Sequence, residues 1–532
     1  MSTPIVLGID LGTSNSVAAV MQGEQIVLIP DAEGNRIHPS VVSFHASGTV
    51  LCGHKGKQRR ITDPENTVFS AKRLIGRRFG SPEVRAMVAR APFTIKEGPR
   101  EQPMIVTRAG EFTVPEIGAY TLGYLKQLAE AYLGVPVERA VITVPANFND
   151  AQREATKAAG RLGGLEVLRI LNEPTAAALA YGYGKSLQSR VAIFDFGGGT
   201  FDITILRLQA RIFEVLATAG DTYLGGDDVD LRLCDSMVQA FLQVHGVDLR
   251  HTPIAVQRLR AVAEQVKCQL SERPRAVVRV QDVARTTDGQ VLDFTFSLTR
   301  DGMNAKIVDI VDRAFVVCDE ALRLAGMDQG AIDDVVLVGG TTKAQLVQER
   351  VKQYFGREPR ADINPDEVVG IGAAIQGATL MQDLRGEQPK ALLLDVTPRA
   401  LGVATVGGYA DTIIQRNAQV PMEQTRIFTT SADNQTQVLL QVCQGESRRF
   451  DENTLLGELT LDGLRPARRG EVRIGVIFEI DTDGILKVRA RDEETGAAQQ
   501  ATISVLGTMT EDEIQAAKQR PGAAAESGRS GS

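Results

Sequence analysis

Two short segments of the sequence have the residue types that bind a phosphate group. In each, an apolar run ends in an aspartate that is followed by glycine and then threonine: VLGIDLGT at residues 6–13 and VAIFDFGGGT at residues 191–200. Glycine at a turn between strands lets backbone N–H groups approach an anion closely, because no Cβ intervenes. The hydroxyl groups of Thr13, Ser14 and Thr200 are further donors. The segments therefore predict two phosphate-binding turns.

Aspartates accompany both turns. Asp10 and Asp195 end the apolar runs, and Asp202 follows the second turn. Bare carboxylates would repel a phosphate, so their presence favours Mg²⁺ between the two groups, held directly or through its waters. The alternative is that Gly197–Gly199 forms only a tight hairpin and that the aspartates cap it. The second copy, 185 positions after the first, favours the nucleotide site and indicates two similar lobes that face one another.

A third glycine cluster could bind the rest of a nucleotide. The apolar run Val335–Val338 leads into Gly339 and Gly340, which suits backbone packed against a base or ribose. Upstream, Glu264, Lys267 and Ser271 share one face of an expected helix. A polar stripe of this kind is usually only a solvated face. Beside a nucleotide, it could instead hydrogen-bond the ribose and adenine.

The elements that position these residues fall into zones. Residues 1–386 alternate short β-branched runs with long amphipathic stretches, which is typical of α/β architecture. Residues 396–506 alternate apolar and polar residues with turn signals between the runs, which predicts an antiparallel β-sandwich. Residues 387–395 form a linker whose three leucines, Leu392–Leu394, are unusual in a solvated segment. They form either the first strand of the sandwich or a segment that docks elsewhere.

Composition and charge exclude several classes of protein. The 532 residues carry 59 Lys and Arg against 66 Asp and Glu, a net charge of −7, which argues against non-specific nucleic-acid binding. No apolar run approaches the roughly 18 residues of a membrane span, and the N-terminus lacks the basic region of a signal peptide. The five cysteines lack metal or disulfide spacing, so we expect a reduced, cytoplasmic protein.

Nine motifs, in order, resemble the DnaK-type, seventy-kilodalton heat-shock chaperone family from about residue 4 to residue 515. They are GIDLGTSNS (8–16), AKRLIGRRF (71–79), VITVPANFNDAQR (141–153), NEPTAAALAYG (172–182), FDFGGGTFD (194–202), GDTYLGGDDVD (220–230), VLVGG (336–340), NPDEVVGIGAAIQG (364–377) and LLLDVTP (392–398). The resemblance implies an actin-like, two-lobed ATPase domain at 1–386, a linker at 387–395 and a β-sandwich at 396–506 that binds extended peptide.

The resemblance also implies roles for individual residues. Lys72 would orient the attacking water and stabilise charge on the transferred phosphoryl group, although its neighbourhood alone reads as a surface basic patch. Glu173 would position water and metal, and Thr200 would contact the γ-phosphate. Asp10, Asp195 and Asp202 would organise Mg²⁺ and any bound K⁺. The nucleotide contacts implied are Gly12, Thr13, Ser14, Asn15, Gly197, Gly198, Gly199, Thr200, Gly225, Gly226, Glu264, Lys267, Ser271, Gly339, Gly340, Lys343 and Asp366.

The adenosine end departs from the family pattern. Many relatives have arginine where Lys343 stands, and some have another where Cys268 stands. A guanidinium plane stacks on adenine, whereas an ammonium group is a hydrated point charge. We therefore expect weaker or faster-exchanging nucleotide binding in this chain.

Allosteric positions follow from the resemblance as well. The segment Leu392–Leu394 with Asp395 resembles a linker that docks on the ATPase domain when ATP is bound and is released with ADP. Pro145, Arg153 and Arg169 match relay positions, although a proline at 145 could also simply punctuate a strand. Burial of a leucine side chain contributes about 1.5–3 kcal/mol, which suits a two-state switch. Relatives often have an aromatic residue in place of Asn147, so the strength of coupling stays open.

The peptide-binding residues are implied by the family, because without it they read as ordinary core. They are Val403, Val406, Phe428, Ser431, Val438 and Leu440. Near them, Arg399 replaces a leucine of the relatives, and Val406 and Ser431 also differ from the residues usual at those positions in the family. Backbone groups would bind an extended peptide without regard to its sequence. These departures leave peptide preference open.

The end of the chain departs most from the family. Thr510–Glu513 reads as a capping box that starts a short helix, and residues 507–532 continue into a Gly/Ala/Ser tail that we expect to be disordered. Relatives continue with a helical lid over the peptide groove. A lidless groove should release peptide quickly. The insert Glu83–Lys96 is similar to that of bacterial members.

Three functions remain open at this level. The first is an ATP-driven chaperone for unfolded polypeptide clients, with a J-domain co-chaperone and a GrpE-type nucleotide-exchange factor as partners implied by the resemblance. The second is a non-catalytic protein that holds ATP as a brace, as exchange-factor relatives do. The third is an actin-like small-molecule kinase, against which the sandwich at residues 396–506 counts.

Overall fold

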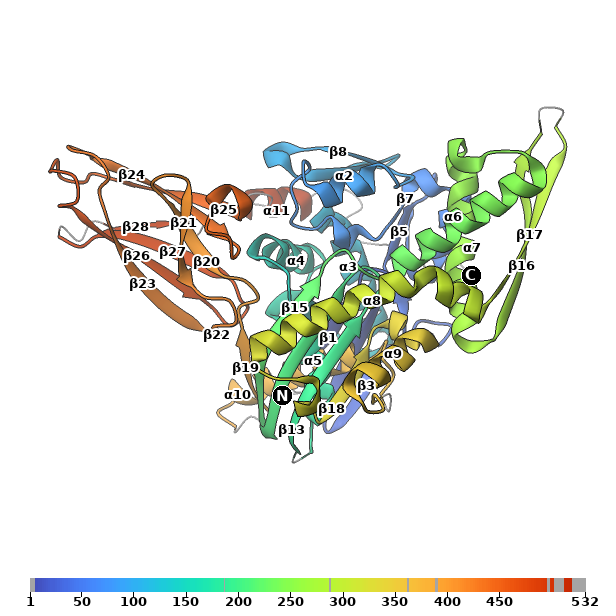
Figure 1. Cartoon of the computed structure of the whole chain (residues 1–532), viewed down its shortest axis with the longest axis horizontal. Coiled ribbons are helices and arrows are strands. Elements are labelled where there is room, and N and C mark those ends of the chain that lie inside the picture. Colours follow the sequence, from blue (N-terminus) through green and yellow to red (C-terminus); the bar gives the residue numbers. More distant parts are fainter. Residues whose placement is uncertain are drawn as a thin grey trace.

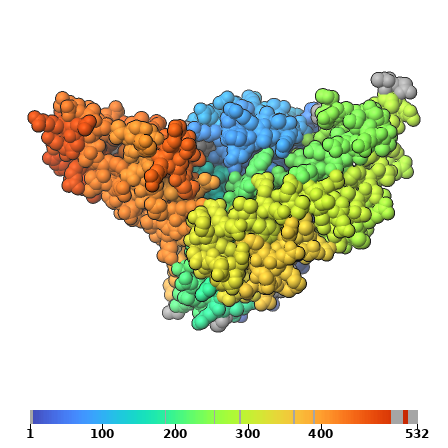
Figure 2. Space-filling view, viewed as in Figure 1, coloured from blue at the N-terminus to red at the C-terminus, as the bar shows by residue number. Residues whose placement is uncertain are grey.

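The computed structural model describes residues 5–185, 187–286, 289–360, 363–387, 391–494, 498–501 and 511–518. Two lobes form the N-terminal part of the molecule, and the sandwich lies at one end of it (Figure 1). Figure 2 shows the surface of the sandwich in continuous contact with that part. Among the described helices, none is long and apolar enough to cross a membrane.

The first lobe is built on the sheet β12–β11–β1–β2–β3, with β4 paired to β2. Its central strands are continuous apolar runs because helices cover both of its faces. Gly8 allows one close contact of this kind, since a Cβ there would lie 2.1 Å from the backbone nitrogen of Ala374 in helix α10 (Val368–Asp383). The strands are β1 (Val6–Leu11), β2 (Asn15–Gln22), β3 (Gln25–Leu28), β4 (His38–Pro39), β11 (Arg139–Val144) and β12 (Glu166–Asn172).

Helices and two smaller sheets complete this lobe. The helices are α1 (Gly53–Thr62), α2 (Pro82–Val88), α3 (Val114–Leu133), α4 (Asp150–Leu162), α5 (Glu173–Gly182) and α10 (Val368–Asp383). The smaller sheets comprise β6 (Val50–Cys52), β5 (Val41–Phe44) and β7 (Thr67–Phe69), and β10 (Gly110–Thr113), β9 (Pro103–Thr107) and β8 (Thr94–Glu97). The short helix η2 (Ala71–Arg73) follows β7.

The second lobe repeats the design of the first. The hairpin β13–β14 lies beside the parallel strand β18, as the hairpin β1–β2 lies beside the parallel strand β11. The two similar lobes expected from the repeated sequence are thus confirmed. Its elements are β13 (Leu187–Phe196), β14 (Phe201–Ala210), β15 (Ile212–Asp221), β16 (Arg275–Arg285), β17 (Val291–Thr299), β18 (Asp334–Val338), α6 (Gly226–His245), α7 (Pro253–Glu272), α8 (Arg300–Ala325) and α9 (Gln345–Phe355).

The leucine segment belongs to both parts of the molecule. It forms β19 (Leu392–Val396), in which residues 392–394 pair in parallel with β15 of the second lobe. The next two residues pair antiparallel with β22 (Gln419–Val420), a short strand outside the two sheets of the sandwich whose Val420 packs in the sandwich core. The two possibilities left open by the sequence are therefore combined in one strand. Leu392 is 47% exposed while Leu393 and Leu394 are half-buried, so docking buries the three leucines only in part.

The sandwich consists of two antiparallel four-stranded sheets, as the alternating pattern predicted. One has the order β21–β20–β24–β25 and the other β23–β26–β27–β28. Inward-facing side chains such as Val403, Val476 and Phe478 form its core. The strands are β20 (Leu401–Thr405), β21 (Tyr409–Ile414), β23 (Met422–Thr429), β24 (Gln437–Gln444), β25 (Thr454–Asp462), β26 (Arg473–Ile480), β27 (Leu486–Asp492) and β28 (Ala498–Ala501).

The expected terminal helix is α11 (Glu511–Lys518). Its side chains Ile514 and Ala517 are buried, and the helix lies against α4 of the first lobe. Glu513 forms an ion pair with Arg100. The predicted cap residue Thr510 and the predicted tail after residue 518 lie outside the described residues.

Candidate functional site

A cavity of about 240 Å³ lies between the lobes where the repeated turns meet. Most of the residues implicated by the sequence line it: Asp10, Gly12, Thr13, Ser14, Asn15, Lys72, Glu173, Asp195, Gly197, Gly198, Thr200, Glu264, Lys267, Gly339, Gly340, Lys343 and Asp366. They come from strand ends, turns and helices of both lobes. Local motifs that are hundreds of residues apart are thus assembled around one space.

The second phosphate turn is held from behind by its carbonyl groups. The Gly197 carbonyl accepts from Thr341 Oγ1 at 2.8 Å and from the Gly226 N–H at 3.0 Å. The Gly198 carbonyl accepts from the Asp227 N–H at 2.8 Å. In a trans peptide the N–H points away from the C=O, so these bonds turn N–H groups to the other side of the loop. The turn is thereby prepared to donate to an anion.

Three aspartates meet beneath the turns, of which Asp195 and Asp202 are buried and Asp10 is half-buried. Asp195 lies opposite Asp202 in the β13–β14 register, and Asp10 accepts from Thr143 Oγ1 at 3.1 Å. Burial, and then the charge of Glu173, raises the pKa of both Asp10 and Asp202 to about 7, and the same two causes raise the pKa of Asp195 well above its ordinary value. A cation bound beside these carboxylates would neutralise their excess negative charge.

These carboxylates fit the magnesium that the family implies. Carboxylate oxygens, water and phosphate oxygens are the ligands Mg²⁺ prefers. Within the described residues, no group of three His, Cys, Asp or Glu side chains is placed to hold a metal by itself. A magnesium ion here would therefore take most of its ligands from phosphate and water, with the aspartates binding those waters.

Lys72 lies in the cleft and not on the surface. Its side chain is 7% exposed, and its Nζ donates to Glu173 Oε1 at 2.5 Å. The ring of Phe148 lies 5.6 Å from the same ammonium group. The reading of this neighbourhood as a solvated basic patch is wrong, because Arg73 is also buried. A buried ammonium group beside three carboxylates and two phosphate turns can stabilise negative charge that develops during phosphoryl transfer.

The adenosine end is formed by α7 and the turn after β18. Lys267 donates to Asp230 at 2.9 Å and to the Gly226 carbonyl at 3.2 Å. Burial alone would lower the pKa of Lys267, but the Asp230 carboxylate raises it. Lys343 forms an ion pair with Asp366. The exposed Cys268 also lines the cavity, where a thiol offers no plane to stack on a base. The predicted weak nucleotide binding stays a prediction.

Not every expected contact reaches the cavity. Gly199, Asp202, Gly225, Gly226 and Ser271 do not line it. Ser271 instead donates to the carbonyl of Lys267 one helical turn earlier, which is an ordinary bond of a helical serine.

The sequence analysis also missed several residues of the site. Lys57, Arg60, Phe69, Ser70, Asp227, Asp230, Arg260 and Thr341 line the cavity as well. Asp227 and Asp230 belong to the motif at 220–230, and Thr341 directly follows the third glycine cluster, whereas the others carry no local signal.

A chain of contacts joins the sandwich to the cleft through Arg153. Its guanidinium donates to the Asp483 carbonyl of the sandwich at 3.4 Å, and to the carbonyls of Ala146 and Phe148 at 3.2 Å each. Pro145 closes the same turn by accepting from the N–H of Phe148 at 3.1 Å. The turn therefore lies between the docked domain and Lys72.

Two further contacts fix the docked arrangement. Arg169 donates to the carbonyl of Thr482 at 3.4 Å. Asp395 of β19 accepts from Asn172 at 3.0 Å and from Thr175 at 3.1 Å, both at the start of α5. Arg153, Arg169 and Asp395 thus form contacts that join the domains, and Pro145 lies in the turn whose carbonyls Arg153 binds.

The expected peptide contacts are spread over the sandwich. Val403 and Leu440 are buried in its core, and Phe428 and Val438 are half-buried at the core's edge. Ser431 is exposed, and Val406 is 81% exposed. Apolar packing at an edge next to exposed residues can accept an apolar side chain, but these positions stay a prediction.

Asp150 is an unusual group at the domain interface. It lies at the first position of α4, where its Oδ1 accepts from the Leu486 N–H of the sandwich at 3.3 Å. Among the described residues its buried Oδ2 has no hydrogen-bond partner, and burial raises the pKa of Asp150 to about 7. The charged groups that face it are Arg153, which lowers its pKa, and Glu154 and Asp481, which raise it.

Docking of the sandwich should therefore weaken as the pH rises. A carboxyl whose pKa is raised by docking binds a proton in the docked state and releases it on separation, so its favourable contribution is present at low pH and lost through about pH 7. Between pH 6 and pH 8 we expect the docking equilibrium to fall about tenfold. The docking equilibrium is measured by protease cleavage near residues 391–396 with ATP present. Asp150→Asn should remove this pH dependence; an equal pH dependence in that variant contradicts the assignment.

The fold and cleft define a two-lobed nucleotide-binding protein with a β-sandwich attached by a shared strand. A sequence model of the family described as "Hsp70 protein" matches residues 6–530. The chain is also 44% identical over 514 residues to the "Chaperone protein DnaK" of Buchnera aphidicola subsp. Schizaphis graminum, which covers 96% of this chain and 80% of that protein. The chain therefore belongs to the Hsp70 family of ATP-dependent chaperones, which are ATPases. The resemblance inferred from the nine motifs is confirmed.

Proposed function

We propose that the cleft binds Mg-ATP with its triphosphate between the turns Gly12–Asn15 and Gly197–Thr200. The adenosine then extends toward Glu264, Lys267 and the Gly339–Gly340 turn. The placement is supported by a cavity that both lobes line, and by the N–H groups that the tied carbonyls of Gly197 and Gly198 leave facing away. The domain limits are 1–386, 387–395, 396–506 and 507–532, with β19 shared between linker and sandwich.

Hydrolysis is an in-line displacement by water in which positioning and electrostatics dominate. Lys72 stabilises charge on the transferred phosphoryl group and orients the water, while Glu173 holds the Lys72 ammonium group and accepts a hydrogen bond from the water. Thr200 donates to the γ-phosphate. Asp10, Asp195 and Asp202 would hold Mg²⁺ largely through its waters, the ion would neutralise phosphate charge, and K⁺ is a second candidate cation there.

The docked strand β19 couples the two domains. With ATP bound, the sandwich is held through Arg153, Arg169 and Asp395, and with ADP these contacts are released. Separation frees the sandwich to close on an extended polypeptide near Val403, Val406, Phe428, Ser431, Val438 and Leu440. A J-domain co-chaperone and a GrpE-type exchange factor are the partner classes. The five unpaired cysteines suit a reducing compartment, and we place the protein in the cytoplasm.

One observation carries this proposal: β19 pairs with the ATPase domain and with the sandwich at once. A fluorescent unfolded peptide is bound in ADP, and its release is followed after addition of ATP or buffer. ATP should accelerate release at least tenfold and should increase protection of residues 391–396 from protease. Peptide should also stimulate ATP turnover. Equal release in both nucleotides, or stimulation by a sugar in place of peptide, rejects the proposal.

A further inference from the structure

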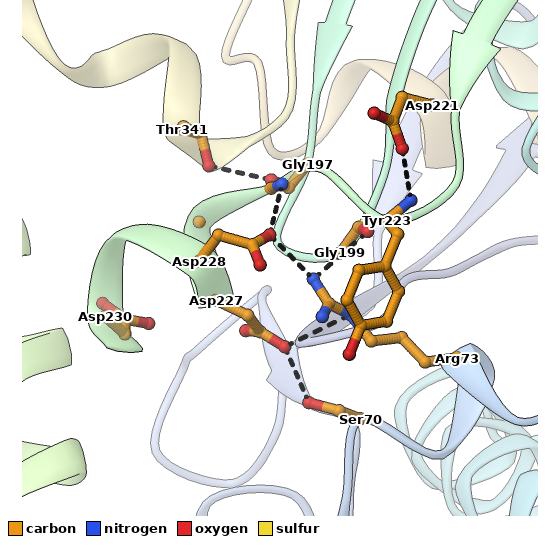
Figure 3. Close-up of polar contacts among 12 residues, drawn as sticks. Ser70, Arg73, Gly197, Gly199, Asp221, Tyr223, Asp227, Asp228, Asp230 and Thr341 are labelled. Carbon is orange, nitrogen blue, oxygen red and sulfur yellow. Dashed lines mark hydrogen bonds and ion pairs between the residues drawn. The ribbon is translucent and has the colours of Figure 1, made fainter. Parts of the chain in front are cut away.

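Arg73 crosses the cleft beside the catalytic lysine. It ends η2 in the first lobe, yet its guanidinium makes polar contacts with the second lobe (Figure 3). Its Nη2 donates to the Gly199 carbonyl at 3.2 Å and to Asp228 Oδ2 at 3.3 Å, and its Nε lies 3.6 Å from Asp227 Oδ2. The residue is 8% exposed. Because a guanidinium group donates in fixed directions, these contacts set the geometry of the groups that it binds in the second lobe.

The guanidinium is fixed in one orientation. The ring of Tyr223 lies 4.8 Å from its Cζ, on the loop that leads into α6. Asp228 also accepts from the Gly225 N–H at 2.9 Å, so its carboxylate cannot turn away from Arg73 freely. Asp227 in turn accepts from Ser70 Oγ at 3.0 Å, which ties it to the first lobe as well. Figure 3 shows these groups gathered around the phosphate turn.

The bond to Gly199 sets the direction of an amide that faces the cavity. Gly197 and Gly198 have their carbonyls held by groups of the second lobe itself, whereas the Gly199 carbonyl accepts from Arg73 of the first lobe. In the planar trans peptide, a Gly199 carbonyl directed at Arg73 turns the Thr200 N–H the opposite way. Thr200 lines the cavity and Gly199 does not, in agreement with this orientation.

We propose that Arg73 is a positioning residue for ATP hydrolysis, which orients the Thr200 N–H toward the γ-phosphate only while the two lobes are closed. The inference rests on the nucleotide site proposed above. An amide aimed in advance at developing charge lowers the barrier, whereas one that must first reorient does not. Fast hydrolysis, and not only tight nucleotide binding, therefore requires the cleft to be closed.

The test separates chemistry from binding. ATP is pre-bound to Arg73→Ala, and its hydrolysis is followed in a single turnover, alongside nucleotide dissociation rates and the ratio of affinities for ADP with orthovanadate and ADP alone. We expect hydrolysis to slow about 10- to 100-fold and that affinity ratio to fall by a similar factor. Arg73→Lys keeps a charge near Asp227 and Asp228 but lacks the planar pair of donors, so it should restore only part of the rate.

Arg77→Ala is the matched control. Arg77 also bridges the lobes, through Thr222 Oγ1 at 3.1 Å, but it touches neither the phosphate turn nor the cavity. Hydrolysis of bound ATP in this variant should stay within about twofold of wild type. If Arg73→Ala hydrolyses bound ATP at the wild-type rate and only releases nucleotide faster, Arg73 is merely a latch and the inference is overturned.

A variant that fails to fold does not leave the question open. Asp228→Asn keeps an acceptor for the Gly225 N–H and removes the charge that holds Arg73, so it should slow hydrolysis several-fold and add little to Arg73→Lys. Full additivity of the two variants contradicts the inference. Absence of hydrolysis by the wild-type chain would instead reject the proposed function itself, which distinguishes the two failures.

Discussion

Replacement of Lys72 by methionine slows the hydrolysis of pre-bound ATP by about 100-fold or more, while ATP still binds. The magnitude follows from the loss of one pre-positioned charge at a site where negative charge develops, which typically costs 10²- to 10³-fold. Lys72 is suited to that effect because its ammonium group is buried next to Glu173, where water screens it little. Methionine keeps the volume of the side chain, so packing against Phe148 is retained.

The variant needs a control for the broken ion pair. Removal of Lys72 leaves Glu173 buried without its cation, which can destabilise the fold by about 3–5 kcal/mol. Thermal unfolding with and without ADP shows whether the variant is folded. Lys96→Met removes a lysine that pairs with Glu111 at the same distance of 2.5 Å, but on the exposed surface. It should hydrolyse ATP at the wild-type rate, and hydrolysis at that rate by Lys72→Met would contradict the assigned role.

The parts of the site that local sequence encodes could be predicted. A turn needs glycine where backbone approaches an anion, and an apolar run ending in aspartate marks the end of a buried strand; both signals are complete within ten residues. Their repetition predicted two lobes, and β1–β2 and β13–β14 are indeed equivalent hairpins. The alternation in residues 396–506 predicted the sandwich for the same reason, since the period of a strand is visible within the strand.

The rest depends on contacts between distant segments. Nothing near Arg73 tells it apart from the more exposed Arg78, because its burial results from Asp227 and Tyr223, which follow about 150 positions later. Helical spacing correctly placed Ser271 on the same face as Glu264 and Lys267. It could not show how far the cavity extends along that face, so Ser271 was predicted as a nucleotide contact although it does not line the cavity. The dual pairing of β19 could not be decided either, because an apolar strand is equally suited to two sheets.

Replacement of Asp483 by alanine is expected to separate the two domains. The side chain lies in the β26–β27 turn of the sandwich and is buried against the first lobe. Its carboxylate accepts from Lys157 Nζ at 2.8 Å and from the buried N–H of Ile170 at 3.2 Å. Loss of a hydrogen bond to a charged group costs about 1.5–3 kcal/mol. A loss of about 2 kcal/mol shifts the docking equilibrium roughly thirtyfold.

The measurement follows docking and its consequence together. In ATP, cleavage by protease near residues 391–396 should increase, and ATP should no longer accelerate peptide release. Asp462→Asn, which changes an aspartate of the same sandwich that is bonded to Gln437 on the neighbouring strand, should change neither. Peptide release that stays fully ATP-dependent in Asp483→Ala would show that these contacts do not carry the coupling.

A second substitution divides the effect between its two causes. Asp483→Asn keeps an oxygen for the Ile170 N–H but loses the charge that faces Lys157, whose side chain is 30% exposed. Water can replace that charge on Lys157, whereas it cannot reach the buried N–H of Ile170, so most of the loss should appear only in the alanine variant. If asparagine uncouples the domains as fully as alanine, the charge around Arg153 and Lys157 holds the interface, and docking should then weaken steeply with salt.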